Sequence, residues 1–238
     1  MSNDVFVWIE QNEGEADPIS WQAMTAARTL ANALGGEMVA LVMGEHIDDL
    51  SHNAAHYGAD RVLSADDSSL NRFRLEPYAA VLTQLALNET PVAIIMGAST
   101  SGLELSAYVA ARLQVGLASD CTDLSVDSGQ IVATRPALIG NLIATVRFKQ
   151  SGSSMMTIRR NVFPPAGQDT NRSVEVSSIP VSMTEADIST KIKSVETAAG
   201  KVSLTDANII VSGGRGVGGP EGFKPVIELA EALGGALG

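Results

Sequence analysis

The fold class is decided by PVAIIMGASTSGLELSAYVAARLQ, residues Pro91–Gln114. Its first part, Pro91–Ser99, is a short apolar run typical of a buried strand, and Gly102–Gln114 has the length and apolar spacing of a helix. Thr100 or Ser101 is expected to cap this helix, because a side-chain oxygen there can accept a hydrogen bond from a free N–H group of the first turn. A strand followed at once by a helix is half of a βαβ unit.

The same alternation of strand and helix runs through the first half of the chain. Parallel strands joined by helices form an open sheet that is covered on both faces, so the sequence predicts an α/β fold with a doubly wound parallel sheet. The expected strands are Val5–Glu10, Glu37–Gly44 and Arg61–Asp66, and the expected helices are Pro18–Leu34, Ile47–Ala59 and Glu76–Thr90.

The pattern changes after Ala118, where strand-like runs follow one another with no helix between them. Ser and Gly residues mark turns between these runs, so an antiparallel extension of the sheet is expected. Its strands are predicted at Asp123–Val126, Gln130–Pro136, Asn141–Phe148 and Met155–Arg160.

A new strand and helix begin near Lys201, with the helix starting at about Pro220. One strand and one helix bury too little surface to form a domain alone. The predicted organisation is therefore an N-terminal α/β domain over residues 1–200, followed by the first βα unit of a second, incomplete domain over residues 201–238.

Composition and net charge indicate which kinds of partner and which compartment to expect. Apolar residues make up 45% of the 238 residues and charged residues 18%, as in a soluble globular protein with a sizeable core. A net charge of −11 repels phosphate backbones and anionic lipid, so neither nucleic acid nor a membrane surface is an expected partner. The N-terminus lacks a basic leader and no apolar run reaches membrane-spanning length, so a cytoplasmic protein is expected, or an organelle-matrix protein whose transit peptide was removed.

Three features of the sequence are of residue types that can form sites. The loop Gly97–Ser106 lies where a strand meets a helix N-terminus and could bind a phosphate, although a plain capped loop is the alternative. His52 and His56 share a helix face and His46 is nearby, but no third metal ligand is evident, so partly exposed helix residues are expected. Cys121 is the single cysteine and has no evident base, which favours a packed structural residue. No catalytic residue and no metal site is predicted.

The strongest candidate site is the loop Gly213-Gly214-Arg215-Gly216 near the C-terminus. It follows the apolar run NIIVS and precedes a helix, which is the context in which backbone N–H groups bind phosphate. Glycines let the backbone approach a diphosphate, and Arg215 adds a planar fork of donors. The four residues are predicted to bind a cofactor, although such a sequence also occurs in ordinary turns.

Longer segments carry a resemblance to a known family. They are TAARTLANALGGEMVALVMG, YGADRVLSAD, LEPYAAVLTQL, IIMGASTSGLELSAYVAARLQVGLASDCTDLSVD, ATRPALIGNLIATVRF and ANIIVSGGRGVGGPEGFKPVIELAEALGGALG. In their order and continuity, these segments resemble the alpha subunit of an electron transfer flavoprotein. The likeness runs essentially from end to end.

The resemblance implies a redox carrier rather than an enzyme, acting as the alpha half of a heterodimer with a beta subunit. FAD would receive electrons from flavin dehydrogenases, such as the acyl-CoA dehydrogenases of fatty acid β-oxidation, and pass them to a quinone reductase or another acceptor. Arg215 would contact the FAD. In this family the second domain continues beyond the point at which this sequence ends, so the main FAD residues are expected to be missing and the chain alone is expected not to hold FAD.

The sequence is also compatible with two other interpretations. The first is a free-standing domain that binds an adenine nucleotide at the Gly97–Ser106 loop. The second is a purely structural scaffold that shapes a heterodimer.

Overall fold

The structure is a computed structural model that describes residues 2–149, 152–195, 204 and 207–238. It divides into two compact units, residues 1–191 and residues 192–238. The predicted boundary between residues 200 and 201 lies outside the described residues.

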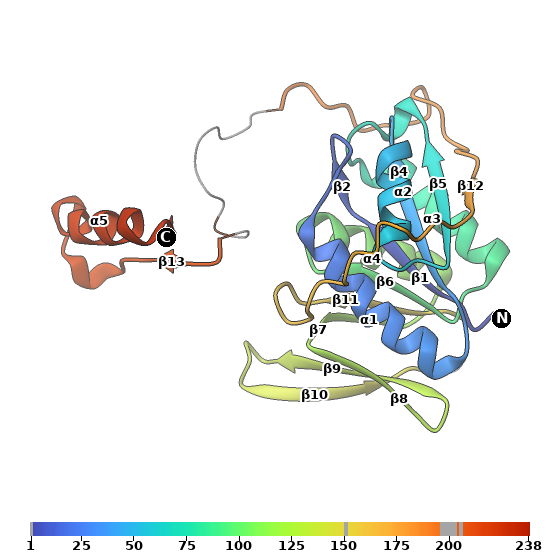
Figure 1. Cartoon of the computed structure of the whole chain (residues 1–238), viewed down its shortest axis with the longest axis horizontal. Helices are drawn as coiled ribbons and strands as arrows, with labels where there is room; N and C mark the ends of the chain where they lie inside the picture. The colour runs from blue at the N-terminus through green and yellow to red at the C-terminus, as the bar shows by residue number, and fades with distance from the viewer. Residues whose placement is uncertain (1, 150–151, 196–203, 205–206) are drawn as a thin grey trace. The chain divides into compact units, whose positions relative to one another are not determined.

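Unit 1 is built on a seven-stranded parallel sheet (Figure 1). The strand order is β12-β5-β4-β1-β6-β11-β7, so β1 lies between β4 and β6 at the point where the order reverses. This arrangement confirms the predicted doubly wound sheet. The strands are β1 (Val5–Ile9), β4 (Met38–Gly44), β5 (Arg61–Asp66), β6 (Ala93–Gly97), β7 (Leu117–Cys121), β11 (Ser154–Ile158) and β12 (Val176–Ser178).

Helices cover both faces of this sheet because each central strand is apolar on both sides. Along β1, Val5, Val7 and Ile9 belong to the core beneath α1 and α2, whereas Phe6 and Trp8 belong to the core beneath α3 and α4. Within the described residues, no helix is long and apolar enough to cross a membrane. The helices are α1 (Pro18–Leu34), α2 (Asp48–His56), α3 (Leu75–Glu89) and α4 (Thr100–Leu113), and a 3-10 turn, η1, spans Ser68–Leu70.

The ends of α1 follow the local signals in the sequence. The Asp17 carboxylate accepts a hydrogen bond from the N–H of Ile19, and Pro18 occupies the first turn. Gly35 ends the helix in the left-handed conformation, with φ 70°. Gly36 then passes so close to Asn3 that a Cβ there would lie 1.9 Å from the Asn3 carbonyl oxygen.

A second sheet of three antiparallel strands, in the order β10-β9-β8, packs beside α1 (Figure 1). Leu124, Ile131 and Ala133 from this sheet join the core beneath α1. The predicted antiparallel extension is thereby confirmed. Its strands are β8 (Asp123–Asp127), β9 (Gln130–Ala137) and β10 (Leu142–Arg147), and a separate small hairpin joins β2 (Gln11–Asn12) to β3 (Glu15–Ala16).

The expected antiparallel strand at Met155–Arg160 was wrong. The strand there, β11, lies in the parallel sheet between β6 and β7 and runs parallel to both. Four of its five residues, Met155 to Ile158, are buried. Continuous burial is typical of a central parallel strand rather than of a half-exposed hairpin strand. Ser151, part of the turn expected before it, lies outside the described residues.

Unit 2 contains the strand and helix that were expected near the C-terminus. β13 is a short strand, and its two residues pair in parallel with β14, a strand that the sequence did not suggest. The elements are β13 (Ile210–Val211), two 3-10 turns η2 (Arg215–Val217) and η3 (Pro220–Phe223), α5 (Lys224–Leu233) and β14 (Ala236–Leu237).

Candidate functional site

The loop Gly213–Gly216 leaves β13 and leads through η2 and η3 to α5. The N–H of Gly213 donates to the carbonyl of Gly238, and the N–H of Val217 donates to the carbonyl of Gly214, which closes η2. Arg215 is exposed, and within the described part of the chain its guanidinium forms no ion pair or hydrogen bond. The loop thus carries a free cation on a constrained backbone.

The glycines of this loop differ in what surrounds them. A Cβ at Gly213 would lie 2.9 Å from the Phe223 ring, so packing within the chain requires glycine there. A Cβ at Gly214 or Gly216 would meet nothing within 4 Å. Gly214 also has a φ of −105°, which any residue can adopt. Neither packing nor backbone strain therefore accounts for the glycine at position 214.

The loop borders an open hollow of about 820 Å³ within unit 2. Gly213, Gly214 and Arg215 form part of its lining. Phe223, Ile227, Leu237 and further residues between Val217 and Pro220 provide the rest, so the lining combines apolar side chains with the arginine. A ligand with an anionic group and a flat apolar group would find both kinds of contact here.

Unit 1 has a second candidate, the Gly97–Ser106 loop at the carboxyl end of β6. The cap of α4 is Ser99, one residue before the predicted Thr100, and its hydroxyl accepts a hydrogen bond from the N–H of Gly102 at 2.9 Å. A Cβ at Gly102 would lie only 2.0 Å from the carbonyl oxygen of Gly97. The loop is therefore folded tightly onto the end of its own strand.

Glu10, which directly follows β1, reaches this loop. The Ser99 hydroxyl donates a hydrogen bond to a carboxylate oxygen of Glu10 at 2.5 Å. Burial raises the pKa of Glu10 above its usual value, and the nearby Asp17 carboxylate adds to the rise, while the hydrogen bonds from Ser99 and Ser101 oppose it. The end of β1 beside the end of β6 is where a doubly wound sheet receives an anionic ligand, and here an acidic side chain lies in that crevice.

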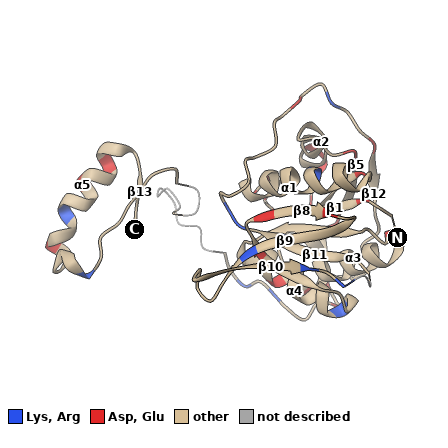
Figure 2. Cartoon of the chain, turned by 90° about the horizontal axis from the view of Figure 1, so that it is seen from below, with Lys and Arg blue, Asp and Glu red and all other residues tan. Residues whose placement is uncertain are grey.

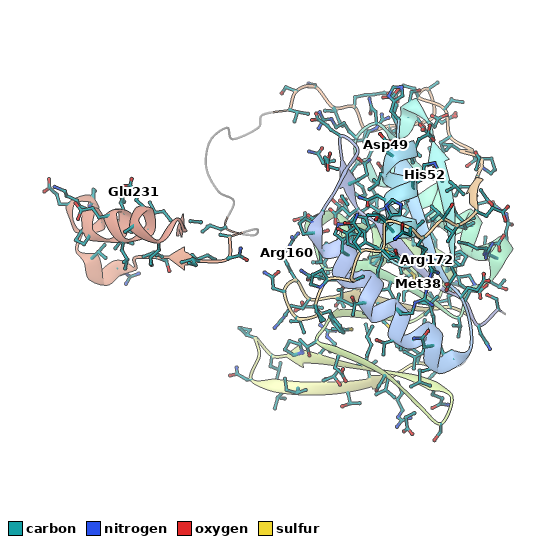
Figure 3. The ribbon with its side chains drawn as sticks, viewed as in Figure 1. Met38, Asp49, His52, Arg160, Arg172 and Glu231 are labelled. Atoms are coloured by element: carbon teal, nitrogen blue, oxygen red, sulfur yellow. The ribbon has the colours of Figure 1, made fainter. Side chains whose placement is uncertain are left out.

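Arg160, which follows β11, lies near the same edge of the sheet (Figure 3). Its guanidinium pairs with Asp17, the cap of α1, at 2.8 Å. Sequence reasoning named neither Glu10 nor Arg160 as a site residue. Glu10 is the first residue after β1, and Arg160 is the second residue after β11. A search for polar residues just beyond the end of each predicted strand would have found both.

The three histidines are not gathered with other metal-ligating side chains in the described part of the chain. His52 and His56 lie on α2, as Figure 3 shows for His52 beside Asp49, and His46 precedes that helix. Among the residues that the structure describes, no three His, Cys, Asp or Glu side chains are placed to hold a metal ion. Cys121 is fully buried at the end of β7, and burial raises the pKa of its thiol to about 12.

Comparison with known proteins identifies the family. Residues 5–184 match the electron transfer flavoprotein domain, and residues 203–238 match the electron transfer flavoprotein FAD-binding domain. The chain belongs to the electron transfer flavoprotein family. The resemblance seen in the sequence is confirmed, and the chain is accordingly a redox carrier rather than an enzyme.

Individual relatives align with this chain over nearly its whole length. It is 38% identical to an electron transfer flavoprotein subunit alpha of Thermoanaerobacterium thermosaccharolyticum, over 99% of this chain and 72% of that protein. It is 40% identical to the subunit alpha of Bacillus subtilis, over 100% of this chain and 72% of that protein. A protein FixB of Clostridium saccharobutylicum is 37% identical, over 98% of this chain and 70% of its own length.

Proposed function

We propose that this chain is the alpha half of a heterodimeric electron carrier and that its Gly213–Gly216 loop contacts the phosphates of FAD. The strongest support is that the family match and the loop geometry fall on the same stretch of the chain. The stretch matching an FAD-binding domain, residues 203–238, contains the described loop that combines an unpaired arginine with glycines. We place that loop in a second domain over residues 201–238.

Different residues of the loop would make different contacts with the cofactor. Arg215 would present its planar donor fork to a phosphate, which a lysine could match in charge but not in geometry. Gly214 and Gly216, whose missing Cβ atoms leave open space, would let the phosphates approach the backbone N–H groups. FAD, when bound, supplies the acceptance and release of electrons, and the protein supplies position and electrostatic environment.

The proposed partners follow from the family. The relatives are named as alpha subunits, which favours an assembly with a companion beta subunit. Electrons would enter from flavin dehydrogenases, such as acyl-CoA dehydrogenases, and leave to a quinone reductase or a similar acceptor. The net charge of −11 suits donors and acceptors with basic docking faces.

The test is to co-express the chain with a companion subunit, add FAD and compare Arg215→Ala and Arg215→Lys with the unmodified protein. A charge-assisted hydrogen bond contributes about 1.5–3 kcal/mol, so Arg215→Ala should weaken FAD binding roughly tenfold to a hundredfold. Arg215→Lys should recover part of this loss.

Lys224→Ala is the matched control, because Lys224 is also exposed in unit 2 but lies outside the residues lining the hollow. Its FAD affinity should equal that of the unmodified protein. Equal affinity for the Arg215→Ala protein would contradict the proposed role of the loop.

A further inference from the structure

The last part of unit 1, residues 179–191, leads from β12 to the boundary with unit 2 and is called the exit segment below. The structure describes all of it and shows no helix or strand there. Ile179 and Val181 nevertheless pack against the core beneath α3 and α4, and Ile188 is 1% exposed. The exit segment is therefore a folded part of unit 1 although it lacks regular secondary structure.

One buried arginine binds the exit segment at two points. Arg74 precedes α3, and its guanidinium donates to both carboxylate oxygens of Glu185, at 2.9 and 2.7 Å. It also donates to the carbonyl of Thr190 at 3.4 Å and to the carbonyl of Ser69, in η1, at 2.7 Å. A bidentate pair of an arginine and a carboxylate fixes orientation as well as distance. Arg74 therefore holds Glu185 in one position relative to the start of α3.

Two further charged side chains hold the same stretch of chain. Glu76, in the first turn of α3, accepts hydrogen bonds from the backbone N–H groups of Ser189 and Thr190 at 3.3 and 3.0 Å. The Lys191 ammonium donates to the Glu185 carboxylate at 3.0 Å and to the Glu185 carbonyl at 2.6 Å. These contacts fall on residues 185–191, directly before the boundary between the units. The four charged side chains are together called the clamp below: Arg74, Glu76, Glu185 and Lys191.

The clamp is a costly way to hold a segment if packing is its only purpose. Arg74 is 6% exposed, and in the described residues its Nε has no hydrogen-bond partner. Burying a charge costs free energy, and apolar residues of similar volume are often as stabilising as a buried ion pair. Apolar contacts such as those of Ile188 also tolerate sliding, whereas directional hydrogen bonds do not. The clamp therefore favours one register of the exit segment over the alternatives.

Long-range charge attraction between the two units is weak. Residues 192–238 contain four Lys or Arg and five Asp or Glu, and α5 bears residues of both signs (Figure 2). Most of the net charge of −11 therefore belongs to unit 1, and a nearly neutral unit is little attracted to it. The chain between Lys191 and β13, called the tether below, thus sets how far unit 2 can reach from unit 1.

We infer that Arg74 and Glu185 are positioning residues for electron transfer. By fixing Lys191 on unit 1, the clamp keeps the exit segment from becoming part of the tether. This inference rests on the proposed function, which places the FAD contacts in unit 2. Release of the exit segment would lengthen the tether by up to about 3.5 Å for each residue released. Effective concentration falls roughly as the −3/2 power of tether length, so a longer tether slows electron transfer between FAD and a donor or acceptor held on the rest of the carrier.

The first measurement uses this chain alone. Spin labels on Glu104→Cys in α4 and Glu231→Cys in α5 report the distribution of distances between the units, since both positions are exposed (Figure 3 labels Glu231). Glu185→Ala should broaden this distribution and extend it to longer distances. Arg72→Ala is the matched control, because Arg72 forms its ion pair with Glu13, between β2 and β3. The control should leave the distribution unchanged.

The double variant Glu185→Ala with Arg74→Met separates positioning from stability. Methionine fills the buried site without a charge, so part of the lost stability should return. The directional contacts with the exit segment stay absent, so the distribution of distances should remain broad. A distribution that returns with the stability would show that the ion pair only stabilises unit 1, and would overturn the inference. An unchanged distribution in the Glu185→Ala protein would overturn it as well.

The second measurement uses the chain assembled with a companion subunit and FAD, and an acyl-CoA dehydrogenase reduced by its substrate is the electron donor. Glu185→Ala and the double variant should each slow reduction of the FAD about twofold to threefold. The potential of the FAD should stay the same, because no clamp residue lies in unit 2. Equal rates despite a broader distribution of distances would overturn the positioning role. If the unmodified assembly does not bind FAD, the proposed function is wrong and the role in electron transfer is wrong with it, whereas the distances in the chain alone decide separately whether the clamp restrains unit 2.

Discussion

The hydroxyl of Ser99 donates a hydrogen bond to the Glu10 carboxylate at 2.5 Å. The same hydroxyl accepts a hydrogen bond from the N–H of Gly102 at the start of α4. Glu10 follows β1 and Ser99 follows β6, so this contact bridges the two strands at which the sheet order reverses. A partly buried carboxylate thus lies where other doubly wound proteins bind an anion.

The first prediction concerns pH. The pKa of Glu10 is raised above its usual value of 4.5, chiefly by burial, so the folded chain binds this proton more tightly than the unfolded chain. The contribution of Glu10 to stability therefore falls as pH rises from 4.5 through the pKa of the folded state. Glu10→Gln keeps the acceptor for Ser99 but does not titrate. Urea unfolding at pH 4.5 and pH 7 should show the variant gaining stability relative to the unmodified chain as pH rises. Glu15→Gln, at an exposed position, is the control; a gain of the same size there would argue against a special role for Glu10.

The second prediction concerns adenine nucleotides. Glu10 brings a carboxylate to the crevice beside the Gly97–Ser106 loop, and Arg160 at the same edge is already paired with Asp17. A phosphate would meet repulsion from Glu10. Calorimetric titration with AMP should show no binding tighter than about 1 mM at this site. Stoichiometric retention of AMP through purification, lost on Ser99→Ala substitution, would instead support the interpretation as a nucleotide-binding domain.

The third prediction concerns an ion pair that fastens the end of unit 1. The buried guanidinium of Arg74 donates to both carboxylate oxygens of Glu185, at 2.9 and 2.7 Å. The hydrogen bonds from Arg74, which is the larger cause, and from Lys191 lower the pKa of Glu185 to about 2. The stabilisation is present above pH 4.5 and is lost as pH falls toward 2.

Glu185→Ala should lower the melting temperature, because it leaves the buried Arg74 without its carboxylate partner. Adding Arg74→Met should recover part of the loss. Hydrogen exchange should rise near residues 184–191, where Glu76 also accepts hydrogen bonds from the backbone N–H groups of Ser189 and Thr190. Glu104→Gln, at an exposed position on α4, should change neither measurement. Unaltered exchange in the Glu185→Ala protein would show that the ion pair does not hold this segment.

The fourth prediction concerns Cys121. Its thiol donates to the carbonyl of Ala118 at 3.3 Å inside the core, and burial raises its pKa to about 12. At pH 8 only about one thiol in ten thousand would be ionised, and the thiolate is the reactive form. Iodoacetamide should therefore leave the folded chain unmodified for hours and label it rapidly in urea. Rapid labelling of the folded chain would show an accessible thiol and contradict a structural role.

The parts of the fold that sequence predicts are those set by local signals. Asp17 and Pro18 begin α1, and Gly35 ends it, because capping depends on neighbouring residues alone. The buried strands β1, β4, β5 and β6 were evident as apolar runs between helices. Unit 1 was therefore predictable as a doubly wound sheet.

The parts that were missed depend on pairing between distant residues. β11 has the same short apolar sequence whether it forms a hairpin or a central parallel strand, and only its position between β6 and β7 decides. β14 has two residues, and their pairing with β13 defines it as a strand. Glu10 is one glutamate after a strand, and its partial burial arises only when Ser99 is brought beside it. The Gly213–Gly216 loop was predicted, but the exposure of Arg215 and the open space at Gly214 required coordinates.

The last prediction separates two adjacent glycines of that loop. A Cβ at Gly213 would lie 2.9 Å from the Phe223 ring and 3.2 Å from Val217, so Gly213→Ala must displace packed side chains and should destabilise unit 2 by about 1–3 kcal/mol. A Cβ at Gly214 meets nothing within 4 Å, so Gly214→Ala should leave stability within about 0.5 kcal/mol of the unmodified protein. If FAD approaches the backbone at Gly214, however, that methyl group would meet the cofactor, and FAD affinity should fall about tenfold or more. Stability is measured by urea unfolding followed by far-UV circular dichroism. FAD affinity is measured by titrating FAD into the protein assembled with its companion subunit. Normal stability together with normal FAD affinity in Gly214→Ala would show that no ligand approaches the backbone there and would confine the contact with FAD to Arg215 and its neighbours.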